Sequence, residues 1–221
     1  MRSFIFNHFQ KLTILFLCGS FSLLLLMIRI KITEEFFYLF LVWNLFLAAI
    51  PFIISLAVTS NKSLQTNKLF LFVFFIIWLL FLPNSFYVIT DLVHLRHSPL
   101  NLLWFDSIML FSFITTSLTA GYYSVIEFRK VFLRYFSTKK TSILIVFIFF
   151  MCGFGIYLGR FLRWNSWDII NNPKTLFTDI VIRVLNPIQY SETWFITLGF
   201  GVFITLYYFF FTNLNTKNVS I

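Results

Sequence analysis

Charged side chains are scarce in this sequence, and their scarcity excludes a soluble protein. Only 11% of the 221 residues are charged and 59% are apolar, whereas roughly a quarter of the residues in a typical globular domain are charged. The 34 phenylalanines alone outnumber the 17 basic and 8 acidic residues together. A soluble fold of this length cannot bury so much aromatic surface, so the chain belongs in a lipid bilayer. Disordered chains, disulfide-rich secreted domains and soluble nucleic-acid-binding proteins are excluded as well.

Cysteine is also scarce, and known processing and catalytic motifs are absent. Cys18 and Cys152 both fall in apolar runs, where a structural disulfide is not expected. No cleavage site of small residues follows the first apolar run, so we expect it to be retained as a membrane span. Neither His-Glu-x-x-His nor Gly-x-Ser-x-Gly occurs. Because repeats and long polar linkers are lacking too, residues 1–221 are expected to form a single membrane domain.

Long apolar segments are what the sequence has in abundance. A membrane-spanning helix needs about 20 mostly apolar residues. The predicted fold class is therefore an all-α membrane protein: a bundle of six transmembrane helices plus a short amphipathic interfacial helix in the last outer loop. The six spans are expected near residues 12–30, 36–58, 69–89, 102–123, 142–159 and 194–211.

The loops on the two sides of the membrane differ in their content of Lys and Arg. When the long loop at 160–192 is left out, the side with both termini holds ten cations, Arg2, Lys11 and Lys217 among them, and the other side holds three. The positive-inside rule then predicts that both termini are cytoplasmic. The formal charge of +9 is expected to face anionic lipid and not nucleic acid.

The outer loop at 160–192 is predicted to contain the amphipathic helix. Asn172 and Pro173 are typical of a helix start, and Asp179 and Arg183 are spaced for an i,i+4 ion pair on its polar face. A helix lying in the plane of the membrane interface fits this pattern. A helix that packs on the bundle as a lid would bury the same apolar face, so both alternatives stay open. The apolar face consists of Leu176, Phe177, Ile180, Val181, Val184 and Leu185.

Polar residues that are costly in a bilayer gather near the outer ends of several spans. Such residues usually face the interior of the bundle and have a partner. Pro83 removes a helical hydrogen bond, so a kink or break is expected there. The freed backbone groups need protein or water around them, which predicts an outward-facing polar pocket. By the rise of a helix, the polar side chains at this depth are Asn44, Asn84, Tyr87, Asp91, His94 and Asp106.

Catalytic and metal-binding candidates follow from the spacing within this band. Tyr87, Asp91 and His94 are spaced i, i+4, i+7 and so share one face of a regular helix. Asp91 and His94 are candidates for an acid/base pair, with Asp106 as a further catalytic candidate. No cofactor is predicted, and a divalent metal is kept as an alternative because carboxylates and imidazole are suitable ligands. Its ligands would be Asp91, His94, Asp106 and Asp168.

Ligand-binding candidates follow from the end of the fifth span. Arg160, Arg163, Trp164 and Trp167 share a face if the helix continues that far. A guanidinium group stacks on tryptophan and fits phosphate or carboxylate. Asn165 and Asp168 have the spacing of a capping box, which predicts a new helix. Simple ion pairs from Asp91 to Arg160 or Arg163 are the structural alternative. The full ligand-binding set is Arg160, Arg163, Trp164, Asn165, Trp167, Asp168, Asn84, Tyr87 and Asn44.

Three stretches of the chain carry a resemblance to a known family. They are Trp-Leu-Leu-Phe-Leu-Pro-Asn-Ser-Phe-Tyr-Val-Ile-Thr-Asp-Leu-Val-His at 78–94, Gly-Ile-Tyr-Leu-Gly-Arg-Phe-Leu-Arg-Trp-Asn-Ser-Trp-Asp at 155–168, and Trp-Asn-Leu-Phe-Leu-Ala-Ala-Ile-Pro at 43–51. These are similar to the hallmark segments of a bacterial membrane-protein family, domain of unknown function 1361. The likeness covers the chain from about residue 36 onward. It implies an integral membrane protein of the bacterial plasma membrane without an established activity.

Three functions stay open at this point. The first is binding of an anionic headgroup, a lipid-linked glycan or a partner segment in the outer pocket. The second is an outer-face enzyme that acts on a lipid-linked substrate, with the arginines as a phosphate clamp. The third is a small-solute transporter, which ranks last because the two halves of the chain show no sequence correspondence. The expected partners are the lipid bilayer and an anionic lipid or lipid-linked substrate, with no nucleic acid.

Overall fold

The computed structural model describes residues 2–217 of the chain and the side chains of residues 8–212. All regular structure within residues 2–217 is helical. The side chains of Arg2 and Lys217, counted above as cations on the side of the termini, lie outside the described part. The all-α fold class is confirmed.

Six of the described helical segments are long and apolar enough to cross a membrane. Each of them overlaps one of the predicted spans almost completely, so the number of spans is confirmed and the protein is a membrane protein. The helices extend beyond the predicted ends, most of all in the fourth span. The six segments are His8–Thr33, Phe37–Ser60, Lys68–His97, Leu103–Tyr135, Thr138–Phe161 and Ser191–Thr212.

The chain divides into two compact units along its sequence. The first unit is Met1–Val131 and the second is Phe132–Ile221. Most of α5 lies in the first unit, and its last residues belong to the second. The elements of the first unit are α1 (Arg2–Thr33), η1 (Phe37–Leu39), α2 (Phe40–Ser60), α3 (Lys62–Thr66), α4 (Lys68–Tyr87), η2 (Val88–His97) and α5 (Leu103–Tyr135).

Helices α2, α4 and α5 pack closely in the first unit. The Ser85 hydroxyl in α4 donates to the carbonyl of Ala48 in α2 at 2.8 Å. The buried Trp78 indole of α4 donates to the Ser124 hydroxyl of α5 at 2.6 Å. Gly121 allows this close approach, because a Cβ at that position would lie 2.7 Å from the Cβ of Ser85. Close packing at small residues and interhelical hydrogen bonds thus hold these helices together. In a bilayer the hydrophobic effect does not drive helices to associate, because lipid tails are as apolar as the side chains.

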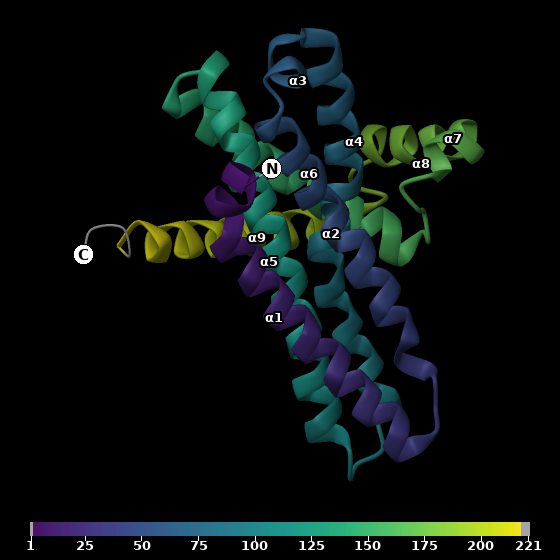
Figure 1. Cartoon of the computed structure of the whole chain (residues 1–221). Coiled ribbons are helices and arrows are strands. Elements are labelled where there is room, and N and C mark those ends of the chain that lie inside the picture. The colour runs from purple at the N-terminus through teal and green to yellow at the C-terminus, as the bar shows by residue number, and fades with distance from the viewer. Residues whose placement is uncertain (1, 218–221) are drawn as a thin grey trace. The chain divides into compact units, whose positions relative to one another are not determined.

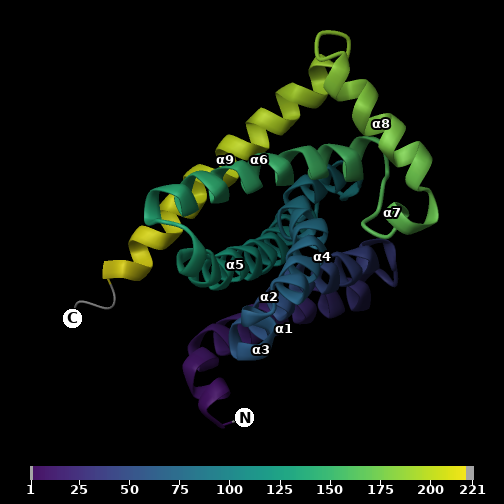
Figure 2. The ribbon, with the colours of Figure 1, turned by 90° about the horizontal axis from the view of Figure 1, so that it is seen from above.

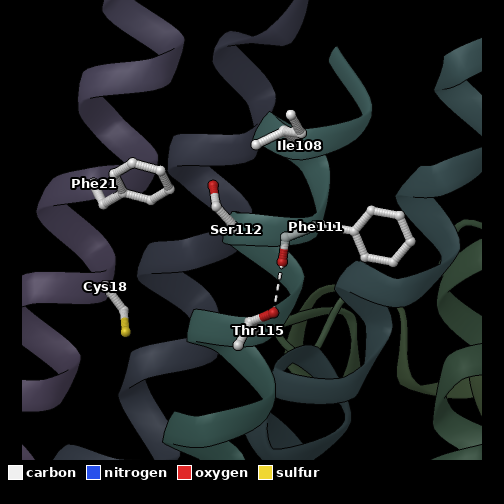
Figure 3. Close-up of a pocket in the computed structure, with 6 residues that line it drawn as sticks. All are labelled: Cys18, Phe21, Ile108, Phe111, Ser112 and Thr115. Carbon is white, nitrogen blue, oxygen red and sulfur yellow. Dashed lines mark hydrogen bonds between the residues drawn. The ribbon is translucent and has the colours of Figure 1, made fainter. Parts of the chain in front are cut away.

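Helices α1 and α5 lie side by side and are joined at both ends (Figures 1 and 2). Lys11 pairs with Glu127 near one end, and Arg29 pairs with Asp106 near the other. Between these ion pairs is a mainly apolar hollow of about 290 Å³ (Figure 3). It is lined by Cys18, Phe21, Ile108, Phe111, Ser112 and Thr115.

Helix α4 differs from the prediction at its outer end. It runs through Pro83 and ends only at Tyr87, so of the predicted kink or break the break is wrong and the kink remains a prediction. The chain then continues as the 3₁₀ helix η2 to His97. A 3₁₀ helix has three residues per turn, so residues three apart are aligned. Asp91 and His94 therefore share a face of η2, whereas the predicted i, i+4, i+7 face with Tyr87 is not formed.

The second unit is built on two long helices that pack against each other, α6 and α9 (Figure 2). Gly153 of α6 faces the backbone of α9, where a Cβ would collide with the carbonyl of Thr197. Two short helices of the outer loop connect the long ones. The elements of the second unit after α5 are α6 (Thr138–Phe161), α7 (Asp168–Asn171), α8 (Pro173–Leu185) and α9 (Ser191–Lys217).

Candidate functional site

One polar group of the first unit centres on Asp91, whose side chain is buried in η2. The Asn44 amide of α2 donates to one carboxylate oxygen of Asp91 at 2.8 Å. The Nε2 atom of His94 lies 4.0 Å from the other oxygen. The structure thus brings together Asn44, Asp91 and His94, three candidates that the sequence placed at a similar depth.

A second polar group joins α1 and α5 at Asp106. The carboxylate of Asp106 is fully buried and accepts hydrogen bonds from Arg29, with Nε to Oδ1 at 2.6 Å and Nη2 to Oδ2 at 3.3 Å. The remaining Nη1 of Arg29 donates to the Thr33 hydroxyl, and Glu35 lies 3.9 Å from it. Because both oxygens of Asp106 are held by a guanidinium, the arrangement supports a structural ion pair more than a catalytic acid.

Tyr38 connects the two groups. The guanidinium carbon of Arg29 lies 5.6 Å from the centre of the Tyr38 ring, a cation–π contact. The Tyr38 hydroxyl shares a hydrogen bond with the Ser98 hydroxyl at 2.8 Å and reaches the carbonyl of His94 at 3.4 Å. The polar residues at this end of α1, α2, η2 and α5 therefore form one connected network.

His94 stands at the edge of this network among aromatic rings. Its ring centroid lies 4.7 Å from that of Phe40, 5.8 Å from that of Phe37 and 6.2 Å from that of His97. In the described part of the chain, no three His, Cys, Asp or Glu side chains are grouped so that they could hold a metal ion. The metal set of Asp91, His94, Asp106 and Asp168 remains a prediction.

Two further candidates of the first unit, Asn84 and Tyr87, lie in the last turn of α4. The Asn84 amide donates to the carbonyl of Phe81 in its own helix at 3.0 Å. The carbonyl of Tyr87 accepts a hydrogen bond from the Thr90 hydroxyl at 2.7 Å, at the junction of α4 and η2. Neither contact belongs to the network around Asp91, and a ligand-binding role for these residues remains a prediction.

The arginine candidates lie at the end of α6 in the second unit, where the predicted shared face is wrong. The helix ends at Phe161, and Arg163 has a φ of 60°, the left-handed conformation that often terminates helices. Arg160 is half-buried in the last turn, whereas Arg163 is exposed beyond it. The four residues Arg160, Arg163, Trp164 and Trp167 therefore do not form one helical face.

The turn that follows Arg163 is closed as the capping-box spacing predicts. The backbone N–H of Asn165 donates to the Asp168 carboxylate at 2.7 Å, and the Asn165 amide donates to the same oxygen at 3.2 Å. Helix α7 begins at Asp168. The predicted new helix is confirmed, and the Asp168 carboxylate is used inside the turn.

A cluster around Arg183 fixes α8 within the second unit. The predicted pair of Asp179 and Arg183 is confirmed, with Nη1 of Arg183 at 3.0 Å from the carboxylate. The Trp164 indole donates to the other carboxylate oxygen at 2.9 Å, and the Arg183 guanidinium carbon lies 5.0 Å from the centre of the Tyr190 ring. Burial opposes the charge of Arg183, but its hydrogen bonds to Tyr157 and Asp179 give a net rise of its pKa. Arg183 is buried, so the polar side of α8 is partly enclosed within the second unit.

The apolar side of α8 is largely uncovered in the structure. Phe177 is 67% exposed and Leu185 is 71% exposed, and Ile170 in α7 is exposed too. Leu176, Ile180 and Val181 on the same side are half-buried. Both alternatives for α8, a helix in the membrane interface and a lid, stay predictions. Helix α8 thus presents apolar side chains outward and keeps its ion pair inside, which is the reverse of a helix on the surface of a soluble domain.

Two of the strongest contacts were not predicted from the sequence. The sequence alone assigns no partner to Arg29 or to Glu127. A charged residue inside an apolar run is a signal in itself, because such a residue needs an opposite charge. The sequence does not say which of several acids that partner is. The single pocket formed by the third, fourth and fifth spans with the outer loop remains a prediction.

Comparison with known proteins identifies the family but no activity. A family described as "Protein of unknown function (DUF1361)" matches residues 43–207, well over half of the chain. This range contains every candidate residue from Asn44 to Asp168, whereas Lys11, Arg29 and Tyr38 lie before it. No curated protein and no solved structure matches the chain. The chain belongs to the DUF1361 family, whose function is unknown.

Proposed function

We propose that the protein binds the anionic headgroup of a membrane lipid or lipid-linked substrate through its outer loop at 160–192. We further propose that it resides in the bacterial plasma membrane with both termini in the cytoplasm, as the distribution of Lys and Arg favours. The proposal rests on the exposure and the contacts of the Arg163 guanidinium. This group is exposed and makes no hydrogen bond or ion pair within the described part of the chain.

Two of the three acids of the same loop are already engaged, and the third, Glu192, lies exposed in the first turn of α9. Asp168 accepts from Asn165, and Asp179 is held by Arg183 and Trp164. Arg163 and Lys174, both exposed, therefore carry positive charge that these carboxylates do not neutralise. A guanidinium group with free donors suits phosphate because it offers paired N–H groups in one plane.

The exposed apolar residues of α7 and α8 support a site at the lipid surface. Ile170, Phe177 and Leu185 would enter the interfacial layer of the bilayer, as amphipathic helices do. Positive side chains on the same loop would then lie at the depth of lipid phosphates. The binding candidates Arg160, Trp164 and Trp167 belong to this loop or to the turn before it.

The conformation of Arg163 allows a test that separates charge from fold. A residue other than glycine pays about 1 kcal/mol for the left-handed backbone conformation, whereas glycine adopts it readily. Arg163→Gly therefore removes the guanidinium without harming the backbone, and Arg163→Lys keeps the charge. We expect the purified Arg163→Gly protein to retain less phosphatidylglycerol in native mass spectrometry, with an unfolding temperature no lower than that of the wild type.

The lysine variant is the matched control, and we expect it to retain most of the bound lipid. The proposal fails if the glycine variant retains as much phosphatidylglycerol as the wild type. It also fails if the lysine variant loses as much lipid as the glycine variant while its unfolding temperature is unchanged.

A second candidate function is supported by the group around Asp91. Asn44 fixes one oxygen of the Asp91 carboxylate, and His94 lies near the other at the rim of the unit. An imidazole positioned by a carboxylate is a common acid/base arrangement, here for an outer-face enzyme acting on a lipid-linked substrate. An Asp91→Asn strain with unchanged lipid and glycan composition would count against this candidate.

A further inference from the structure

The two ion pairs between α1 and α5, Lys11–Glu127 and Arg29–Asp106, are separated by a defined distance along these helices. Lys11 and Arg29 are separated by about 27 Å along α1, and Asp106 and Glu127 by about 31 Å along α5, at the rise of an α-helix. The hydrocarbon core of a bilayer is about 30 Å thick. The spacing of the two ion pairs thus equals the thickness of the core, which would place them at its two boundaries, where lipid headgroups begin.

The two boundaries differ in charge. At one, Arg29 is matched by Asp106 and approached by Glu35, so acids outnumber bases. At the other, the single carboxylate of Glu127 is held by Lys11 at 2.5 Å and by Lys130 at 2.7 Å. His8 lies 3.7 Å from the same carboxylate. The Glu127 cluster thus has one acid and two ammonium groups, and its net charge is positive.

The donors of this cluster exceed its acceptors. An ammonium group has three N–H donors, and within the described residues the hydrogen bonds of the two lysines all go to Glu127. The Lys11 ammonium also lies 5.3 Å from the centre of the Tyr123 ring. The carboxylate is 1% exposed, so water does not share it, whereas the Lys130 side chain is 57% exposed. The two ammonium groups therefore still have N–H donors for an approaching anion. The Glu127 carboxylate, which would repel the anion, is buried.

From this geometry we infer a binding site for a phosphate group at Lys11, Glu127 and Lys130, on the side of the membrane predicted to be cytoplasmic. Its depth makes the headgroup of an anionic phospholipid the fitting ligand, and free phosphate offers the same chemistry. Glu127 draws the two ammonium groups together, and the phosphate neutralises their remaining charge. The residues of this site belong to the first unit, whereas Arg163 belongs to the second.

Lys130 offers a test that leaves the fold intact, because its side chain is largely exposed and Lys11 still holds Glu127. Lys62 provides the matched control: it is also exposed, lies on the same predicted side and is not part of the cluster. The proteins are purified from nanodiscs of phosphatidylcholine and phosphatidylglycerol, and retained lipid is counted by native mass spectrometry. We expect Lys130→Gln to lower phosphatidylglycerol retention about fivefold, the usual contribution of one basic residue near an anionic surface.

Charge reversal extends the test. We expect Lys130→Glu to lose the preference for phosphatidylglycerol, while Lys62→Gln and Lys62→Glu behave like the wild type. Equal losses in the Lys62 and Lys130 variants would overturn the site, because they would reflect surface charge in general. Unchanged retention in Lys130→Glu would overturn it as well.

Delipidated protein distinguishes the two sources of phosphate. A rise in unfolding temperature on adding inorganic phosphate, present in the wild type and absent in Lys130→Glu, would show that the phosphate group alone is sufficient. A rise with phosphatidylglycerol only would assign the site to the lipid. If neither ligand stabilises the wild type more than Lys130→Glu, the inference is wrong.

Discussion

Arg29 of α1 and Asp106 of α5 form a two-point ion pair, with N···O distances of 2.6 and 3.3 Å, in which both side chains are buried. Removal of one partner of a buried pair leaves an uncompensated charge and costs about 3–5 kcal/mol. We therefore expect Asp106→Ala to lower the unfolding temperature in detergent markedly, or to abolish folding.

The double variant Arg29→Met with Asp106→Leu tests the cause of this loss. Replacing a whole buried pair by apolar residues of similar volume is often neutral, so the double variant should be more stable than Asp106→Ala. A double variant that is less stable than Asp106→Ala would show that Asp106 matters for a reason other than its pairing with Arg29.

The spans were predictable because membrane insertion depends on local composition. Residues 142–159, for example, need only be apolar over the thickness of the bilayer, and α6 covers them all. The pairing of Arg29 was not predictable in the same way. Several acids lie at its depth, and the choice of Asp106 depends on how α1 packs against α5.

Local backbone geometry was predicted less well than the spans. The change from α4 to the 3₁₀ helix η2 leaves the same residues apolar, so hydropathy carries no sign of it. The left-handed turn after α6 is usually announced by glycine or asparagine, and here it is formed by Arg163. Amphipathic spacing placed Arg183 on the polar side of α8 but does not reveal that Asp179 and Tyr190 enclose it.

The contact between α6 and α9 leads to a prediction about two glycines. A Cβ on Gly153 would collide with the carbonyl of Thr197, whereas one on Gly199 would meet no atom within 4 Å. We expect Gly153→Ala to lower the unfolding temperature because the helices must separate. Gly199→Ala should raise stability, by up to about 1 kcal/mol, because alanine is the better helix former.

Thermal unfolding of both variants side by side gives the comparison. Equal effects of the two substitutions would contradict the close approach of α6 and α9 at Gly153. Both substitutions add one methyl group to a helix, so effects common to any Gly→Ala change cancel when the two unfolding temperatures are compared.

Asp179 and Asp168 allow a similar comparison within the outer loop. The Asp179 carboxylate bonds the buried Arg183 and the Trp164 indole. Among the described residues, the Asp168 carboxylate bonds the exposed Asn165 alone. We expect Asp179→Ala to cost about 3 kcal/mol or more, because it leaves a buried guanidinium without its charge partner. Asp168→Ala should cost about 1 kcal/mol, the usual net contribution of a hydrogen bond. Chemical unfolding monitored by circular dichroism measures the free energy of unfolding of both variants. A larger decrease for Asp168→Ala than for Asp179→Ala would contradict the stabilising role of the cluster around Arg183.

The uncovered side of α8 predicts how deep this helix lies in the bilayer. Phe177 is 67% exposed and apolar, and Lys174 is exposed at the start of the same helix. If α8 lies in the interface, a spin label at Phe177→Cys should collide more with oxygen, which is enriched in lipid. A label at Lys174→Cys should collide more with a water-soluble nickel complex. Cys18 and Cys152 are first replaced by serine and alanine, so that each protein carries one label in lipid vesicles. Equal, water-like accessibility at both positions would contradict an interfacial α8, because the exposed side of Phe177 would then face water.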